Sequence, residues 1–245
     1  HVMARRQRQM CIRDSRNRPT DEVLHRKLVK ASMTVIKNKR NILPIKDLKK
    51  NQKIAYVSLG DDSGAVFCES LNKYTRVTEV NSDNLSHLLQ KLDDFDLVIV
   101  GSHTSNTNPW KSFKFSNKEI VWLHEIARKN KIILTVFASP YSLLDVKSFS
   151  NIEGIILGYQ NSIIAQQIAA QTIFGAVEAT GKLPVSIKNE FLVGTGIHTQ
   201  NLQRLQYTLP EEVGMSSEIL SKVDSIAKLV LLSLIHISEP TRQWS

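Results

Sequence analysis

Two short strings contain the residue types of a serine acyl-transfer site. Ser70-Leu71-Asn72-Lys73 fits the Ser-x-x-Lys pattern of a lysine-activated serine, and Ser82-Asp83-Asn84 fits the Ser-Asp-Asn pattern of the same enzymes. The second string follows the first too closely for that class, and the sequence contains no Lys-Thr-Gly string. We interpret both as chance matches. A third match, Ser225-Ile226-Ala227-Lys228, lies near the C-terminal end.

Polar and aromatic side chains follow the apolar run 96–101. His103 and Asn106 come shortly after it, followed by Trp110 and Phe113. Ligands of α/β proteins bind at the carboxyl ends of the strands, so His103 and Asn106 are candidate substrate-binding residues. The alternative for His103, which is favoured, is a loop histidine that is hydrogen bonded to other groups of the protein. Trp110 and Phe113 would either stack on a ligand or pack against another domain, and packing is favoured.

No metal or cofactor site is indicated by the remaining motifs. The string Gly60-Asp61-Asp62-Ser63-Gly64 lacks the Gly-x-Gly-x-x-Gly spacing and the P-loop lysine, which favours a plain strand-to-helix turn. The two cysteines, Cys11 and Cys68, do not have metal-ligand spacing. We expect Cys68 to be a small apolar residue on a helix.

The elements that would position these residues alternate between apolar runs and helical patterns. The pattern predicts strands at 53–59, 76–80, 96–101, 131–137 and 154–159, and helices at 64–71, 84–92, 118–129 and 162–178. Continuous apolar strands that alternate with helices are typical of a parallel sheet covered on both faces. We therefore predict an α/β fold, with a doubly wound, mostly parallel sheet of about five or six strands and helices on both faces.

The segments that flank this core have weaker patterns. Apolar residues between 23 and 36 fall near helical spacing, and 41–45 is expected to be extended because Pro44 disfavours helix in the residue before it. A last short strand is predicted at 183–187. A fresh helix begins near 216, with little sequence after it against which to pack.

Composition excludes two broad classes of function. The formal net charge is +9, but the basic residues are spread along the chain, whereas nucleic-acid binding requires them to cluster. The chain has no run of 18 apolar residues, so we predict no transmembrane helix. Hydrophobic residues make up 42% and charged residues 22% of the chain, as in an ordinary globular protein with a sizeable core.

We divide the chain into five segments. Residues 1–15 and 231–245 resemble translated sequencing-adapter read-through, and such strings are excluded from fold reasoning. Between them we expect an α/β domain at 16–190, a linker at 191–215 and the truncated start of another domain at 216–230. Because these boundaries leave no native start in view, the sequence says nothing of a signal peptide.

Several strings resemble one family. Residues 31–38 and 42–45 are similar to the entry of the C-terminal domain of family 3 glycoside hydrolases, and 167–186, with its Gly-Lys-Leu-Pro-Val string, is similar to that domain's last helix and strand. Residues 137–143 resemble its β-N-acetylhexosaminidase branch. Residues 207–227 resemble the start of a serine β-lactamase-like domain that is fused to such enzymes in Bacteroidetes. The resemblance covers roughly residues 20–230.

The resemblance implies a partner domain that carries the catalytic residues. A (β/α)₈ barrel, which is outside this sequence, would carry the aspartate nucleophile, and the substrate would be a carbohydrate. In β-glucosidase-type members a glutamate of the C-terminal domain serves as acid/base, but residues 101–115 contain no Asp or Glu. That departure favours the hexosaminidase type, whose acid/base lies on the barrel, so we expect no catalytic residue in this chain and no activity from it alone.

His103 and Asn106 would then bind sugar hydroxyls. The resemblance also implies a bacterial origin and a periplasmic or cell-surface location. Two other readings stay open, a serine β-lactamase-like hydrolase fragment and a non-catalytic α/β ligand-binding module.

Overall fold

The computed structural model describes residues 19–48, 52–105, 110 and 112–237, without the side chains of 19 and 231–237. The chain forms two compact units. One comprises Arg26–Gln206, and the other joins His1–His25 to Tyr207–Ser245. Among the described residues, no helix is long and apolar enough to cross a membrane.

The larger unit is built on a six-stranded sheet with the strand order β1-β6-β5-β4-β2-β3. Its strands are β1 (Thr34–Asn38), β2 (Ile54–Gly60), β3 (Val77–Glu79), β4 (Leu97–His103), β5 (Ile132–Phe137) and β6 (Gly154–Leu157). β1 is antiparallel to β6, and the other neighbouring strands are parallel. The predicted fold class is thereby confirmed.

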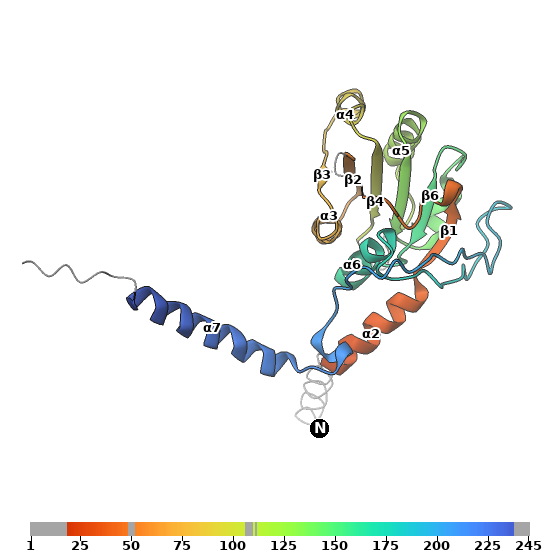
Figure 1. Ribbon diagram of the computed structural model, residues 1–245. Helices are drawn as coiled ribbons and strands as arrows, with labels where there is room; N and C mark the ends of the chain where they lie inside the picture. Colours follow the sequence, from red (N-terminus) through yellow and green to blue (C-terminus); the bar gives the residue numbers. More distant parts are fainter. Residues whose placement is uncertain (1–18, 49–51, 106–109, 111, 238–245) are drawn as a thin grey trace, which may run out of the picture. The chain divides into compact units, whose positions relative to one another are not determined.

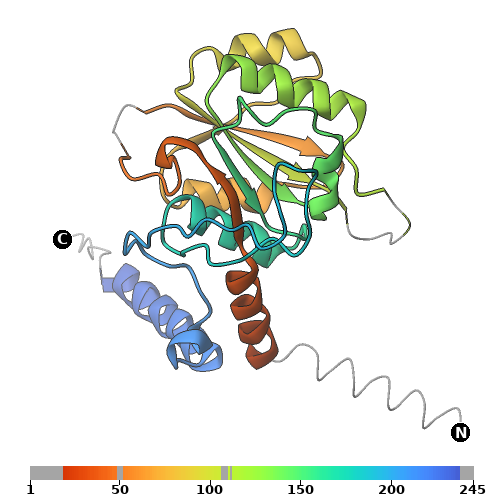
Figure 2. The ribbon, with the colours of Figure 1, turned by 90° about the vertical axis from the view of Figure 1, so that its right-hand side faces the viewer.

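Two layers of helices cover the sheet. α3 (Ala65–Asn72) and α6 (Ile163–Ile173) lie on one face, and α4 (Leu85–Leu92) and α5 (Asn117–Lys129) lie on the other (Figure 1). Figure 2 shows the sheet between these layers. Residues of β2, β4 and β5 are buried on both faces, which explains their unbroken apolar pattern. Short 3₁₀ turns, η1 (Lys39–Asn41) and η2 (Pro140–Asp145), follow β1 and β5.

Local sequence signals set the helix boundaries. Asn84 caps α4, accepting the amides of Ser86 and His87. Ser116 and Glu119 form a capping box at the start of α5. α6 ends at Ile173, earlier than the predicted residue 178, because Gly175 has φ +70° and Ala176 bonds back to the carbonyl of Gln171.

The N-terminal helix was also predicted to extend too far, to Ile36. The helix α2 (Pro19–Ser32) stops before Thr34-Val35-Ile36, which is a strand rather than a continuation of the helix. Three consecutive β-branched residues favour a strand, and pairing with β6 buries them.

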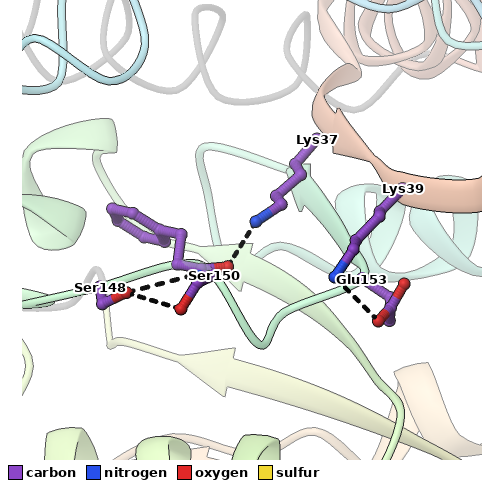
Figure 3. A network of polar contacts seen from close by, with 6 residues as sticks. Lys37, Lys39, Ser148, Ser150 and Glu153 are labelled. Carbon is purple, nitrogen blue, oxygen red and sulfur yellow. Dashed lines mark hydrogen bonds and ion pairs between the residues drawn. The ribbon is translucent and has the colours of Figure 1, made fainter.

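Side chains of β1 and its following turn bind the segment between η2 and β6. Lys37 donates its Nζ hydrogen to the carbonyl of Phe149, and Lys39 forms an ion pair with Glu153 over 3.6 Å (Figure 3). Nearby, the hydroxyls of Ser148 and Ser150 lie 2.9 Å apart. Burial lowers the pKa of Lys37. These contacts hold β1, which is antiparallel to β6, against the segment that leads into β6.

Residues 191–206 belong to the larger unit, whereas we predicted that a linker begins at 191. The amide of Ile197 donates to the carbonyl of Val35 over 2.8 Å, and that of Leu202 donates to Gly175 over 2.7 Å. The Arg204 guanidinium donates to the carbonyls of Ile45, Lys46 and Phe174 over 2.7–2.9 Å. Such dense bonding is not that of a linker. The predicted strand at 183–187 is reduced to one isolated bridge between Ile187 and Phe191.

The smaller unit contains η3 (Pro210–Val213) and α7 (Ser217–Ile237). Glu211 accepts hydrogen bonds from the amide and hydroxyl of Ser217, over 2.8 and 2.9 Å, at the start of α7. These bonds lower the pKa of the Glu211 carboxyl. Every described side chain of α7 from Ser217 to Val230 is exposed.

Candidate functional site

The carboxyl ends of the central strands meet at one edge of the sheet. Gly60 of β2 pairs with His103 of β4, and His103 pairs with Phe137 of β5. The connection after β2 leads outward to β3, whereas β4 lies on its other side, so the strand order reverses between β2 and β4. Such a switch point is where open α/β sheets bind ligands.

A cavity of about 660 Å³ opens at this switch point. That volume lies within the range of small-molecule sites. Its lining combines hydroxyls, charges and aromatic rings, in Ser58, Leu59, Gly60, Asp61, Ser82, Thr104, Ser112, Lys114, Phe115, Ser116, Lys118, Glu119 and Trp122.

All four charged residues of the lining have a partner within the domain. Lys114 pairs with Asp145 over 3.5 Å, and Lys118 lies 4.8 Å from the ring centroid of Trp122. Glu119 accepts the amide of Ser116 over 2.6 Å, and Asp61 accepts the amide of Ser105 over 3.1 Å. A cavity whose charged groups already have partners within the domain suits a neutral ligand with hydroxyl groups better than a strongly charged one.

His103, a predicted substrate-binding residue, lies beside this cavity but is fully buried at the end of β4. Its Nε2 atom is 2.7 Å from the Tyr56 hydroxyl, and its Nδ1 atom is 2.8 Å from Oδ1 of Asn161. The imidazole stacks on Phe137 with a centroid distance of 4.7 Å. Both ring nitrogens are therefore occupied by protein partners, as in the alternative of an internally bonded histidine. Contact of the ring with a sugar stays a prediction.

The electrostatics of this cluster follow from burial. Burial lowers the pKa of His103, against the opposing effects of Asn161 and Asp62. Burial also raises the pKa of Tyr56. At the solvent side, the hydrogen bond from Asn161 lowers the pKa of the Asp62 carboxyl, with help from the amide of Ser63. At neutral pH the cluster thus contains a neutral imidazole, a neutral phenol and an ionised carboxylate.

The other predicted residues have different outcomes. Asn106 lies outside the described residues, so its role stays a prediction. Trp110 is 92% exposed, and the Phe113 ring lies 6.2 Å from that of Tyr141. Ser70 of the first Ser-x-x-Lys string is buried, which is unsuited to a nucleophile that must meet a substrate.

Sequence reasoning missed Asp61 and Asn161. Asp61 stands directly after Gly60 at a strand end, which is a usable signal. Asn161 follows β6, and its bond with His103 joins residues 58 positions apart, for which no local pattern exists.

Fold and site together define an open α/β domain with a ligand-sized cavity at its switch point. Residues 33–217 match the family model described as the glycosyl hydrolase family 3 C-terminal domain. The chain therefore belongs to this family, as its resemblance implied. The comparison with curated protein sequences found no match.

Solved structures share the fold. A fungal multi-domain family 3 β-N-acetylglucosaminidase matches with a TM-score of 0.55 and 23% identity, over 67% of this chain and 19% of that one. The β-glucoside phosphorylase BglX matches with a TM-score of 0.57 and 18% identity, over 69% and 32%. A family 3 β-N-acetylglucosaminidase from Paenibacillus sp. matches with a TM-score of 0.53 and 13% identity, over 69% and 33%. The chain thus spans about a fifth to a third of these proteins.

Proposed function

We propose that this chain is the accessory domain of a multi-domain glycoside hydrolase. It would pack against a catalytic (β/α)₈ barrel and form one wall of the substrate cleft with its carboxyl-end cavity. The observation that carries the proposal is the family match over residues 33–217. The small share of each matched structure that the chain covers supports a larger assembly around it.

The chemistry of the cavity agrees with a binding role. Retaining glycosidases that use two carboxylates hold them about 5–5.5 Å apart across the glycosidic bond. Residues 101–115, which lead from β4 towards α5, contain no carboxylate to serve as one of the pair. Hydroxyl groups, Asp61 and the rings of Phe115 and Trp122 instead offer hydrogen bonds and apolar surface to a sugar. The catalytic groups would come from the barrel.

The finer assignment concerns the sugar. The resemblance of residues 137–143 to the β-N-acetylhexosaminidase branch supports an N-acetylhexosaminide as substrate. In the structure this segment forms the end of β5 and the start of η2, next to the strand that ends in His103.

Restoring a barrel tests the proposal. The purified chain should not hydrolyse p-nitrophenyl N-acetyl-β-glucosaminide, because it contains no complete catalytic pair. The same chain joined to the barrel of a family 3 β-N-acetylglucosaminidase should raise the kcat/KM of that barrel at least tenfold. The barrel alone, and the barrel joined to an unrelated α/β domain, are the controls. Turnover by the chain alone would contradict the proposal.

A ligand-binding module that works without a barrel is the second candidate, and the switch-point cavity favours it. Calorimetric titration of the chain with N-acetylglucosamine and with a nucleotide separates the two. Micromolar binding of either ligand, together with failure of the barrel fusion, would favour the module.

A further inference from the structure

With a neutral imidazole, the polar cluster around His103 has one consistent arrangement of hydrogens. The backbone amide of Phe67 is a donor and lies 2.9 Å from Oε1 of Gln166, which fixes that oxygen as the acceptor. The amide nitrogen of Gln166 must then donate, and it lies 2.9 Å from Oδ1 of Asn161 and 3.1 Å from the carbonyl of Ser63. The orientation of Gln166 is therefore set by the backbone.

The same logic continues from Asn161 to Tyr56. Because Oδ1 of Asn161 accepts from Gln166, it must also accept from Nδ1 of His103, which therefore carries the hydrogen. In the neutral imidazole Nε2 is then an acceptor, and the Tyr56 hydroxyl donates to it over 2.7 Å rather than to the Gly64 carbonyl, which is 3.5 Å away. The amide nitrogen of Asn161 is left to bond the Asp62 carboxyl. Each donor meets an acceptor along the whole chain of bonds.

Glycines make room for the imidazole. A side chain at Gly64 or Gly101 would collide with Nε2 of His103, and one at Gly60 would collide with the His103 carbonyl. That carbonyl accepts the amides of Asp61 and Asp62 over 3.0 and 3.3 Å. Through these contacts, the histidine touches the turn after β2 from both its side chain and its backbone.

We infer that His103 is a positioning residue, whose neutral Nδ1–H imidazole holds the turn of residues 60–64 so that Asp61 faces the cavity. Asp61 in turn accepts the amide of Ser105, two residues after the end of β4, over 3.1 Å. This inference rests on the proposed function in one respect, which is that the cavity binds the substrate. The role of His103 in holding the turn does not depend on it. In this role the histidine acts through Asp61 and Asp62, and the role requires no contact between the imidazole and the ligand.

Nuclear magnetic resonance of the chain tests the inference without any barrel, so failure of the barrel fusion and failure of this inference are distinguishable. Long-range ¹H–¹⁵N spectra should show His103 as the neutral Nδ1–H tautomer between pH 6.5 and 8. Tyr56→Phe removes one hydroxyl, and it should speed hydrogen exchange of the Asp61, Asp62 and Ser105 amides about tenfold, since a buried acceptor loses its donor.

Tyr74→Phe is the matched control. It removes a hydroxyl that donates to the carbonyl of Leu205 over 2.7 Å, and it should leave those three amides unchanged. His103→Leu should speed their exchange further, and His103→Asn, which keeps a donor towards Asn161, should restore part of the protection. An Nε2–H tautomer would overturn the inference. Equal exchange at these amides in the wild type and the Tyr56→Phe variant would also overturn it.

Discussion

The two helical layers of the larger unit are joined to the sheet by different contacts. Beneath α4 and α5 the buried residues are mainly aliphatic, such as Leu88, Leu123 and Leu134. Beneath α3 and α6 the apolar residues surround hydrogen-bonded groups that include Tyr56, His103 and Gln166. We call these the aliphatic face and the polar face. The aliphatic face is held to the sheet by the shape and volume of its side chains. The polar face is held by hydrogen bonds as well, and it adjoins the turn that lines the cavity.

The largest expected loss of stability comes from a substitution in the aliphatic face. Leu88 is fully buried on α4, and Leu88→Ala should lower the free energy of unfolding by about 2–5 kcal/mol, because it leaves a cavity. Val121→Ala, at a position 53% exposed on α5, is the control and should change it by less than about 0.5 kcal/mol. Urea unfolding followed by circular dichroism measures both. A loss below 1 kcal/mol for Leu88→Ala would mean that this face is loosely packed.

A methyl group at residue 64 should disturb the polar face through collisions with two side chains. Gly64→Ala places a carbon against the Tyr56 hydroxyl and against the His103 imidazole, and it should cost about 1–3 kcal/mol of unfolding free energy. Tyr56→Phe removes the hydroxyl, so the double variant should be more stable than the sum of the single losses by about 1 kcal/mol. Strict additivity in this double-mutant cycle would show that the collision with His103, rather than the one with Tyr56, sets the cost.

The pH dependence of stability should come from the polar face. His103 has a lowered pKa in the folded state, so below pH 6.5 the unfolded chain binds a proton that the folded chain does not. The stability due to this residue is full above pH 6.5, and it is lost as the pH falls through the folded pKa. The slope is at most about 1.4 kcal/mol per pH unit for one proton.

Comparison of two glutamine variants isolates this contribution. His103→Gln should flatten the dependence of the unfolding free energy between pH 5 and 7, and His87→Gln, at an exposed position on α4, should not. Denaturant titrations at four pH values would measure it. Equal slopes for the two variants would assign the acid sensitivity to other groups.

The smallest expected change in stability concerns two buried threonine hydroxyls, one with hydrogen-bond partners and one without. Within the described residues, the buried Oγ1 of Thr135 has no hydrogen-bond partner, whereas that of Thr34 bonds the carbonyl of Ser32 and the Tyr159 hydroxyl over 2.8 Å each. Thr135→Val should be neutral or stabilising by up to about 1 kcal/mol, and Thr34→Val should cost about 1 kcal/mol. Thermal unfolding compares them. A clear loss for Thr135→Val would reveal a partner for its hydroxyl.

The sequence was sufficient for elements whose signals are local and repeated. The apolar runs at 96–101 and 131–137 are long, and the caps at Asn84 and Ser116 precede clear helical periods. Between 23 and 36 the same reasoning was right for the helix up to Ser32. It failed at Val35 and Ile36, where helical spacing continues but pairing with β6 decides the outcome. Helix propensity there is weaker than the burial gained in the sheet.

The candidate site was predictable in place but not in detail. The strand ends at Gly60 and His103 located the edge where the cavity lies. The buried state of His103 depends on Tyr56, Asn161 and Gln166, which come from three distant parts of the chain. Those pairings follow from tertiary packing, and no spacing in the sequence encodes them.

The segment 191–206 also has a consequence for handling the protein. Its Ile197 amide pairs with Val35, on the outermost strand of the sheet. A version shortened to residue 190 would leave that strand's outer carbonyl open to pairing with other molecules, and such edges promote aggregation. It would also lose the three carbonyl contacts of Arg204. For expression and crystallisation, a safe end point therefore lies at or beyond Gln206.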